Sequence, residues 1–148
     1  MKKNIIISLI FLVIGIILGT KIISLSKRED VFQNETIYYF RQEGVYTTEE
    51  ILNENTESLN IKLINKDENK YYVYLGITKD VENAKKIKKI YKNKGYDIYI
   101  EEKTLSNEEF SSNITQFDLL INSTNNEEEI LKITEVVLAN YEEIIKKQ

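Results

Sequence analysis

Hydrophobic residues are distributed unevenly along this chain. Residues 5–25 are almost entirely Ile, Leu, Val and Phe, whereas the remainder alternates short apolar runs with Lys, Glu and Asn. Twenty-one residues extend about 31 Å as a helix, enough to cross a hydrocarbon core of about 30 Å. The pattern therefore predicts one N-terminal transmembrane helix, and with it the lipid bilayer as a partner. This predicted membrane segment includes Ile5, Phe11, Gly15, Gly19 and Leu25.

The charges around this run give a predicted orientation. Lys2 and Lys3 precede it, and Lys21 lies near its end, where the side chain can reach the headgroups. A short basic tail before a first apolar segment usually stays in the cytoplasm, so we expect the rest of the chain outside the cell membrane. A cleaved signal peptide is the alternative, although residues 20–24 contain no small-residue cleavage site.

After a polar linker over residues 26–36, strand-like and helix-like patterns alternate. Aromatic and β-branched residues predict four short strands, over residues 37–42, 61–64, 71–75 and 96–100. One helix should start at the Thr47–Glu50 segment, and a second should start after Asp80 and stop at Gly95. The order βαββαβ closes naturally into a four-stranded antiparallel sheet with both helices on one face.

Two apolar stripes predict two more helices near the C-terminus, which should pack on the sheet or on each other. The stripes are Phe110, Ile114, Phe117 and Ile121, then Ile130, Ile133, Val137, Tyr141 and Ile144. The predicted fold class is therefore α+β. The predicted divisions are a cytoplasmic stub and anchor (1–25), a linker (26–36), the sheet domain (37–102) and a C-terminal helical extension (103–148).

Composition narrows the possible functions. The formal charge is −4, and leaving out Lys2, Lys3 and Lys21 leaves 17 basic against 24 acidic residues, a charge of −7. That balance argues against nucleic-acid binding. The chain has no His and no Cys, so the usual metal ligands and nucleophile–base pairs are missing. We expect no cofactor and no catalysis; a glycosidase with paired carboxylates is the remaining enzymatic alternative.

Two segments carry a family resemblance. Residues 42–46 read Gln-Glu-Gly-Val-Tyr, which fits a Q-x-G-x-aromatic opening, and a predicted helix follows directly. The second half repeats the unit, with Glu-Asn-Ala at residues 82–84 and Lys-Gly-Tyr-Asp-Ile-Tyr-Ile at residues 94–100. Together with the βαββαβ order, residues 37–102 resemble SPOR (sporulation-related repeat) domains. The resemblance implies a peptidoglycan-binding module that recognises glycan strands stripped of their stem peptides in cell division or sporulation.

Strand alternation suggests which side chains would meet a glycan. Val73 and Leu75 point to one face, and the tyrosines between and before them to the other. If the aliphatic residues face the helices, the opposite face is open, and the family resemblance adds two residues of the first strand. The candidate glycan-binding residues are Phe40, Gln42, Lys62, Tyr72, Tyr74 and Tyr99.

Two alternatives stay open at this stage. The C-terminal helices, rather than a ligand, can cover the tyrosine-rich face. The domain can also serve as a membrane-tethered adaptor that binds another protein, such as a division or sporulation protein, without glycan. Arg41 and Glu43 stand where inward apolar residues are expected, which predicts an edge position or a bulge for the first strand.

Overall fold

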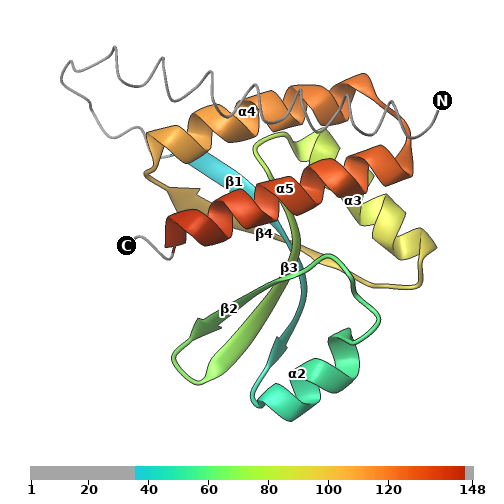
Figure 1. Ribbon diagram of the computed structural model, residues 1–148, viewed down its shortest axis with the longest axis vertical. Helices are drawn as coiled ribbons and strands as arrows, with labels where there is room; N and C mark the ends of the chain where they lie inside the picture. Colours follow the sequence, from blue (N-terminus) through green and yellow to red (C-terminus); the bar gives the residue numbers. More distant parts are fainter. Residues whose placement is uncertain (1–35, 146–148) are drawn as a thin grey trace.

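Four strands form one antiparallel sheet in the computed structural model, which describes residues 36–145 (Figure 1). The strands are β1 (Thr36–Tyr46), β2 (Leu63–Asp67), β3 (Lys70–Thr78) and β4 (Tyr99–Leu105). They lie in the order β2-β3-β1-β4, and each neighbouring pair is antiparallel. The predicted four-stranded antiparallel sheet is therefore present, with β1 and β3 in its centre.

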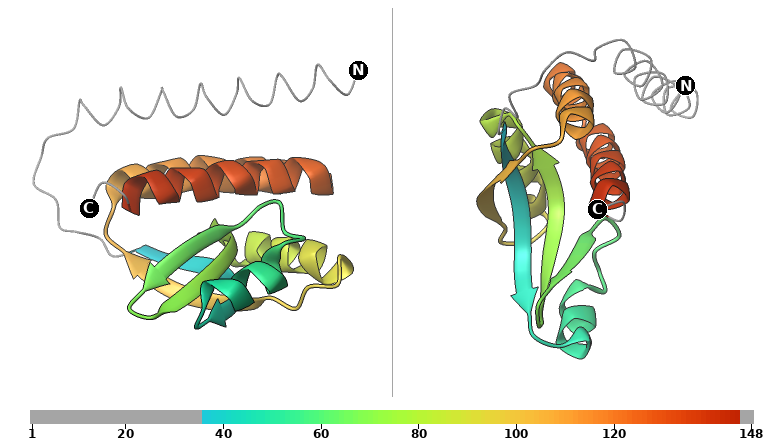
Figure 2. Two further views of the ribbon diagram at one scale, coloured as in Figure 1. Left: turned by 60° about the horizontal axis from the view of Figure 1, so that its bottom comes forward. Right: turned by 90° about the vertical axis from the view of Figure 1, so that its left-hand side faces the viewer.

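Helices pack on both sides of this sheet. They are α2 (Glu49–Thr56), α3 (Val81–Asn93), α4 (Glu108–Ser123) and α5 (Glu127–Ile145). In Figure 2 (left), α4 and α5 lie side by side as a layer that is separate from α2 and α3. Consecutive β1 residues contact different layers: Phe40 packs on Tyr141 of α5, whereas Arg41 Nε donates to the Ala84 carbonyl of α3. Because strand side chains alternate, α5 covers the face opposite α3.

Strands β1 and β3 continue past their predicted ends at residues 42 and 75, through Gly44 and Gly76. At Gly76, an added Cβ would lie 3.0 Å from Thr134 of α5 and 3.4 Å from Ile87 of α3. Glycine is therefore needed here because two helices approach the strand closely, not because the strand stops. The β1–β3 register shifts twice, between Phe40 and Gln42 and between Gln42 and Gly44. The predicted bulge in the first strand is thus present, although β1 is central.

The predicted helix boundaries agree well where capping residues mark them. Asp80 is the N-cap of α3, and its side chain accepts from the backbone amides of Glu82 and Asn83. Gly95 follows that helix with φ +90°, a conformation that favours glycine. The fourth strand differs more, because it begins at Tyr99 rather than residue 96 and continues to Leu105.

The predicted membrane span requires a correction. Residues 5–25, including Ile5, Phe11, Gly15, Gly19 and Leu25, lie outside the described residues. Within residues 36–145, no helix is long and apolar enough to cross a bilayer, because charged and polar side chains recur along each helix. This finding contradicts the predicted single-pass fold and the predicted cell-membrane location, and we do not retain either.

Candidate functional site

Three of the candidate glycan-binding residues lie in one row across the sheet. Gln42 on β1 pairs with Tyr74 on β3 and with Tyr99 on β4. Side chains opposite one another in an antiparallel pair project from the same face. Phe40 and Tyr72 lie two residues from members of this row, on the same face. We call Phe40, Gln42, Tyr72, Tyr74 and Tyr99 the aromatic face.

Helix α5 covers part of the aromatic face. Phe40 and Tyr74 are 0% and 1% exposed. The Phe40 ring meets the Tyr74 ring at a centroid distance of 5.1 Å and the Tyr141 ring of α5 at 5.2 Å, both edge to face. The sequence left open whether a ligand or the C-terminal helices cover this face. At Phe40 and Tyr74, a C-terminal helix covers it.

The remainder of the aromatic face is open to solvent. Tyr99 is 60% exposed, and Gln42 and Tyr72 are half-buried. The Tyr72 ring lies nearly parallel to the Tyr74 ring, with centroids 6.5 Å apart and an interplanar angle of 11°. We call Gln42, Tyr72 and Tyr99 the open strip: two aromatic rings and one amide, supported from below by buried aromatic residues.

Lys103 is a member of this site that the sequence did not indicate. Its Nζ lies 5.2, 5.7 and 4.7 Å from the ring centroids of Phe40, Tyr72 and Tyr74. The predicted fourth strand ends at residue 100, three residues before Lys103. Extending the Tyr99 alternation to Glu101 and Lys103 would have placed both on the aromatic face, and no breaker residue argues against that extension.

A short polar chain joins Lys103 to the buried tyrosine. Lys103 Nζ donates to the Tyr74 hydroxyl over 2.5 Å, and that hydroxyl donates to Glu101 Oε2 over 3.2 Å. Burial raises the pKa of Tyr74 above its usual value, and the negative charge of Glu101 raises it further. Tyr74 therefore stays a neutral phenol that can accept from the lysine and donate to the carboxylate at once.

Lys62 is held in a different place. Its Nζ donates to the Thr56 carbonyl over 2.6 Å, at the last residue of α2. An ammonium at a helix C-terminus donates a hydrogen bond to a carbonyl that has no partner within the helix. Its positive charge also interacts favourably with the negative end of the helix dipole. Lys62 also precedes the first residue of β2, so the structure gives it a capping contact rather than a position in the row.

Arg41 is completely buried, and no carboxylate among residues 36–145 forms an ion pair with it. Nε donates to the Ala84 carbonyl over 2.9 Å and Nη1 to the Phe40 carbonyl over 3.2 Å, while Nη2 has no hydrogen-bond partner among residues 36–145. Burial lowers the pKa of Arg41 to about 10. The side chain sits on the α3 side of the sheet, away from the open strip.

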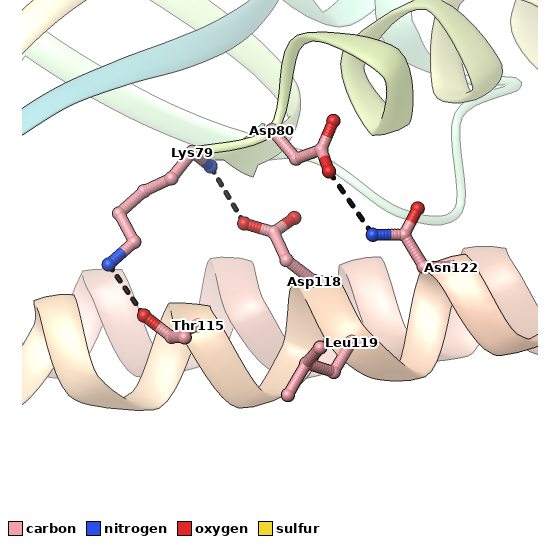
Figure 3. Close-up of a pocket in the computed structure, with 6 residues that line it drawn as sticks. All are labelled: Lys79, Asp80, Thr115, Asp118, Leu119 and Asn122. Atoms are coloured by element: carbon pink, nitrogen blue, oxygen red, sulfur yellow. Dashed lines mark hydrogen bonds between the residues drawn. The ribbon is translucent and has the colours of Figure 1, made fainter.

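A separate polar cleft of about 450 Å³ lies where α4 meets the turn between β3 and α3 (Figure 3). Asp118 accepts from the Lys79 backbone amide, the Asn83 amide and the Thr78 hydroxyl. Lys79 Nζ donates to Ser111 and Thr115 of α4. Because hydrogen bonds between α4 and the β3–α3 turn satisfy both charged groups, we interpret the cleft as the joint that fixes α4 to the sheet. Its lining residues are Lys79, Asp80, Thr115, Asp118, Leu119 and Asn122.

Comparison with known proteins adds one weak likeness. No protein-family model matches this chain, and neither does any curated protein. The chain aligns with one solved structure, the peptidoglycan binding domain of the Bacillus subtilis cell wall lytic enzyme CwlC. The alignment has a TM-score of 0.39 and 20% sequence identity, and it covers 52% of this chain and 98% of that domain. A TM-score below 0.5 does not establish a shared fold, so the function proposed below rests on this chain's own residues.

The open strip and the groups beside it offer a surface on which a ligand can bind. Within residues 36–145, no group of three or more His, Cys, Asp and Glu side chains could hold a metal ion. Glu101, on the same face, accepts a hydrogen bond from Tyr74 and lies 3.5 Å from Lys103 Nζ. Aromatic rings, an amide and an ion pair on one sheet face suit a polar ligand with apolar patches.

Proposed function

We propose that this chain is a non-catalytic protein that binds the glycan strands of peptidoglycan through the open strip. The observation that carries the proposal is the pairing of Gln42 with Tyr99 across β1 and β4, on a face where both are accessible. Tyr72 extends this surface on β3. Phe40 and Tyr74, expected as contacts from the sequence, act in this proposal as the buried support of the strip.

The chemistry of the strip suits a sugar polymer. The C–H faces of a pyranose pack on aromatic rings, and an amide such as Gln42 can both donate to and accept from sugar hydroxyls. Neighbouring strands lie about 4.8 Å apart, so rings on β3 and β4 flank the amide on β1 within the length of a disaccharide. The sequence resemblance supports the same assignment, since Gln42 opens the Q-x-G-x-aromatic segment. A role in cell division or sporulation is the finer part of this proposal and follows from that resemblance alone.

Co-sedimentation of the full chain with purified sacculi tests the proposal. We expect more protein in the pellet after an amidase has removed the stem peptides. Tyr72→Ala and Tyr99→Ala should each weaken binding about fivefold, which corresponds to roughly 1 kcal/mol for one lost ring contact. Tyr71→Ala is the matched control, because Tyr71 is also half-buried on β3 but points to the opposite face. Unchanged binding in both strip variants, with no gain on stripping, would contradict the proposal.

A second candidate, a protein-binding adaptor, is favoured by two exposed apolar side chains on the other face. Ile37 is 53% and Ile100 37% exposed, and both project from the α3 side of the β1–β4 pair, where β4 is an edge strand. Exposed β-branched residues beside a free strand edge are typical of docking surfaces. Ile37→Lys with Ile100→Lys should abolish capture of a partner protein and leave sacculus binding unchanged.

A further inference from the structure

Lys103 lies in a cage of aromatic rings. Phe40, Tyr72 and Tyr74 each place a ring centroid within 5.7 Å of its ammonium nitrogen, and Glu101 Oε2 lies 3.5 Å from it. Three rings and a carboxylate around one ammonium form the arrangement that proteins use to hold alkylammonium ligands. Another lysine over a ring, Lys66, meets a single ring, so the cage is not a general property of this surface.

The cage has a closed floor and an accessible mouth. Phe40 and Tyr74 are fully buried, while the Lys103 side chain is 29% exposed and enters from the edge strand β4. A lysine side chain on an edge strand can rotate into solvent without moving the backbone. Its departure would leave a cation-selective space lined by three rings, with one carboxylate at the rim.

We propose that the cage is a binding site for an ammonium group of a ligand, and that Lys103 occupies it in the free protein as an internal substitute. Exchange of one ammonium for another keeps the charge beside Glu101 and restores the same ring contacts. The free-energy change of this exchange is therefore close to zero, and additional contacts of the ligand with the protein decide the affinity. Occupancy by Lys103 lowers the apparent affinity, because only the open fraction of the protein can bind.

The ligand follows from the open strip beside the cage, and this step rests on the proposed function. A glycan of amino sugars carries a nitrogen on each ring; when the acetyl group is missing, that nitrogen is an ammonium. A sugar held on Tyr72 can present such an ammonium to the cage. An acetamide is neutral and gains no cation–π energy there, so the site would select glycan that has lost acetyl groups.

Calorimetric titration of the full chain at about pH 6 tests this inference. The ligands are two defined oligomers, the hexamer of glucosamine and the hexamer of N-acetylglucosamine. We expect the glucosamine hexamer to bind about tenfold more tightly, a difference of roughly 1.4 kcal/mol. Lys103→Gln removes the competing ammonium and should tighten glucosamine binding by about tenfold again, whereas the acetylated hexamer should show no such gain. Tyr72→Leu should abolish the preference, and Tyr72→Phe should retain it. Lys66→Gln is the matched control and should change neither affinity.

Several results would overturn the inference. Equal affinities for the two hexamers, absence of binding to both, or weaker glucosamine binding by Lys103→Gln would each show that Lys103 is not an internal substitute. Circular dichroism and the urea midpoint show whether each variant is folded. Sacculus co-sedimentation is independent of these titrations, because acetylated sacculi can bind to the open strip without using the cage. The proposed function can therefore stand if this inference fails.

Discussion

Tyr74 joins the hydrophobic core to the polar edge of the open strip. Its ring packs edge to face on Phe40, while its hydroxyl reaches Lys103 and Glu101. The residue next to it in the row, Gln42, remains accessible. Tyr74 thus belongs to the core, whereas Gln42 beside it belongs to the binding surface. Truncation of a buried side chain should therefore lower stability, and truncation of an accessible one should not.

Truncating Tyr74 should have a large effect on stability. Tyr74→Ala should lower the free energy of unfolding by about 3 to 5 kcal/mol, because it empties a fully buried ring position. Tyr74→Phe should lower it by about 1 kcal/mol, because only the hydroxyl contacts are lost. Tyr99→Ala should change it by less than about 0.5 kcal/mol, since its side chain is largely exposed. Urea denaturation measures all three; similar losses for Tyr74→Ala and Tyr99→Ala would contradict the observed burial.

Arg41 carries a buried charge that its contacts satisfy incompletely. Arg41→Met should preserve the free energy of unfolding at pH 7 or raise it by about 1 kcal/mol, because an apolar side chain of similar length replaces an unpaired charge. Arg41→Ala should lower it by about 3 kcal/mol through the cavity it leaves. A loss of more than about 2 kcal/mol in Arg41→Met would instead show that the guanidinium contacts stabilise the fold.

At the scale of secondary-structure elements, the approach of α5 to β3 decides which part of the aromatic face is covered. The two elements approach closely at Gly76, where an added Cβ would lie 3.0 Å from Thr134 Cγ2. Thr134 also donates its hydroxyl to the Ile130 carbonyl within α5. The methyl group of Thr134 is the atom of α5 that a side chain added at Gly76 would meet first.

A double-mutant cycle tests that contact. Gly76→Ala should lower the free energy of unfolding by about 1 to 3 kcal/mol, because the new methyl group overpacks the helix–strand contact. Thr134→Ser removes the opposing methyl group and keeps the hydroxyl, so the double variant should recover at least about 0.5 kcal/mol. Chemical denaturation of the four proteins gives the coupling energy. Simple additivity would indicate that α5 does not approach β3 at this point.

At the scale of the whole molecule, the two C-terminal helices turn a βαββαβ sheet with one free face into a sheet packed on both sides. Asp118 and Lys79 join α4 to the β3–α3 turn, and α5 packs along β3 and β2. What remains accessible is the open strip of Gln42, Tyr72 and Tyr99 instead of the full sheet face. Eight of the ten tyrosines lie in the core or are packed against it.

These tyrosines predict sensitivity to alkaline pH. Burial raises the pKa of five of them above the usual value near 10, to about 12 for Tyr46 and Tyr91. A raised folded-state pKa stabilises the protein fully below the unfolded-state pKa, and this stabilisation is lost as pH rises. The urea midpoint should therefore be lower at pH 11.5 than at pH 9.5. The five residues are Tyr38, Tyr46, Tyr74, Tyr91 and Tyr141.

Two variants sharpen this alkaline prediction. Tyr91→Phe should keep the stability near pH 7 and reduce the loss above pH 10, because one titrating phenol is removed. Arg41 acts in the opposite direction, since its lowered folded-state pKa of about 10 makes the wild type gain stability above that pH relative to Arg41→Met. Five tyrosines outweigh one arginine, so the net slope should be negative. A midpoint that stays constant from pH 9.5 to pH 11.5 would contradict the burial of these phenols.

Much of the fold was determined by local sequence patterns. The four-stranded antiparallel sheet, the N-cap at Asp80, the stop at Gly95 and the two C-terminal helices were all predicted, because alternation, capping and helical periodicity depend only on near neighbours. The same local rules put Tyr72, Tyr74 and Tyr99 on one face. They did not explain Gly76, where glycine is needed because α5 packs against the strand at Thr134, nearly 60 residues further along the chain.

Only the tertiary structure decided which of these side chains are accessible. Alternation gives the face of a strand but does not say what packs on it, and the apolar stripe of α5 fits a sheet face as well as another helix. The position of α5 buries Phe40 and Tyr74, leaves Gln42 and Tyr99 open, and allows Lys103 to enter a ring cage built from three other positions. These outcomes depend on the long-range packing of α5 on β3, a contact between segments whose separation in sequence carries no local signal.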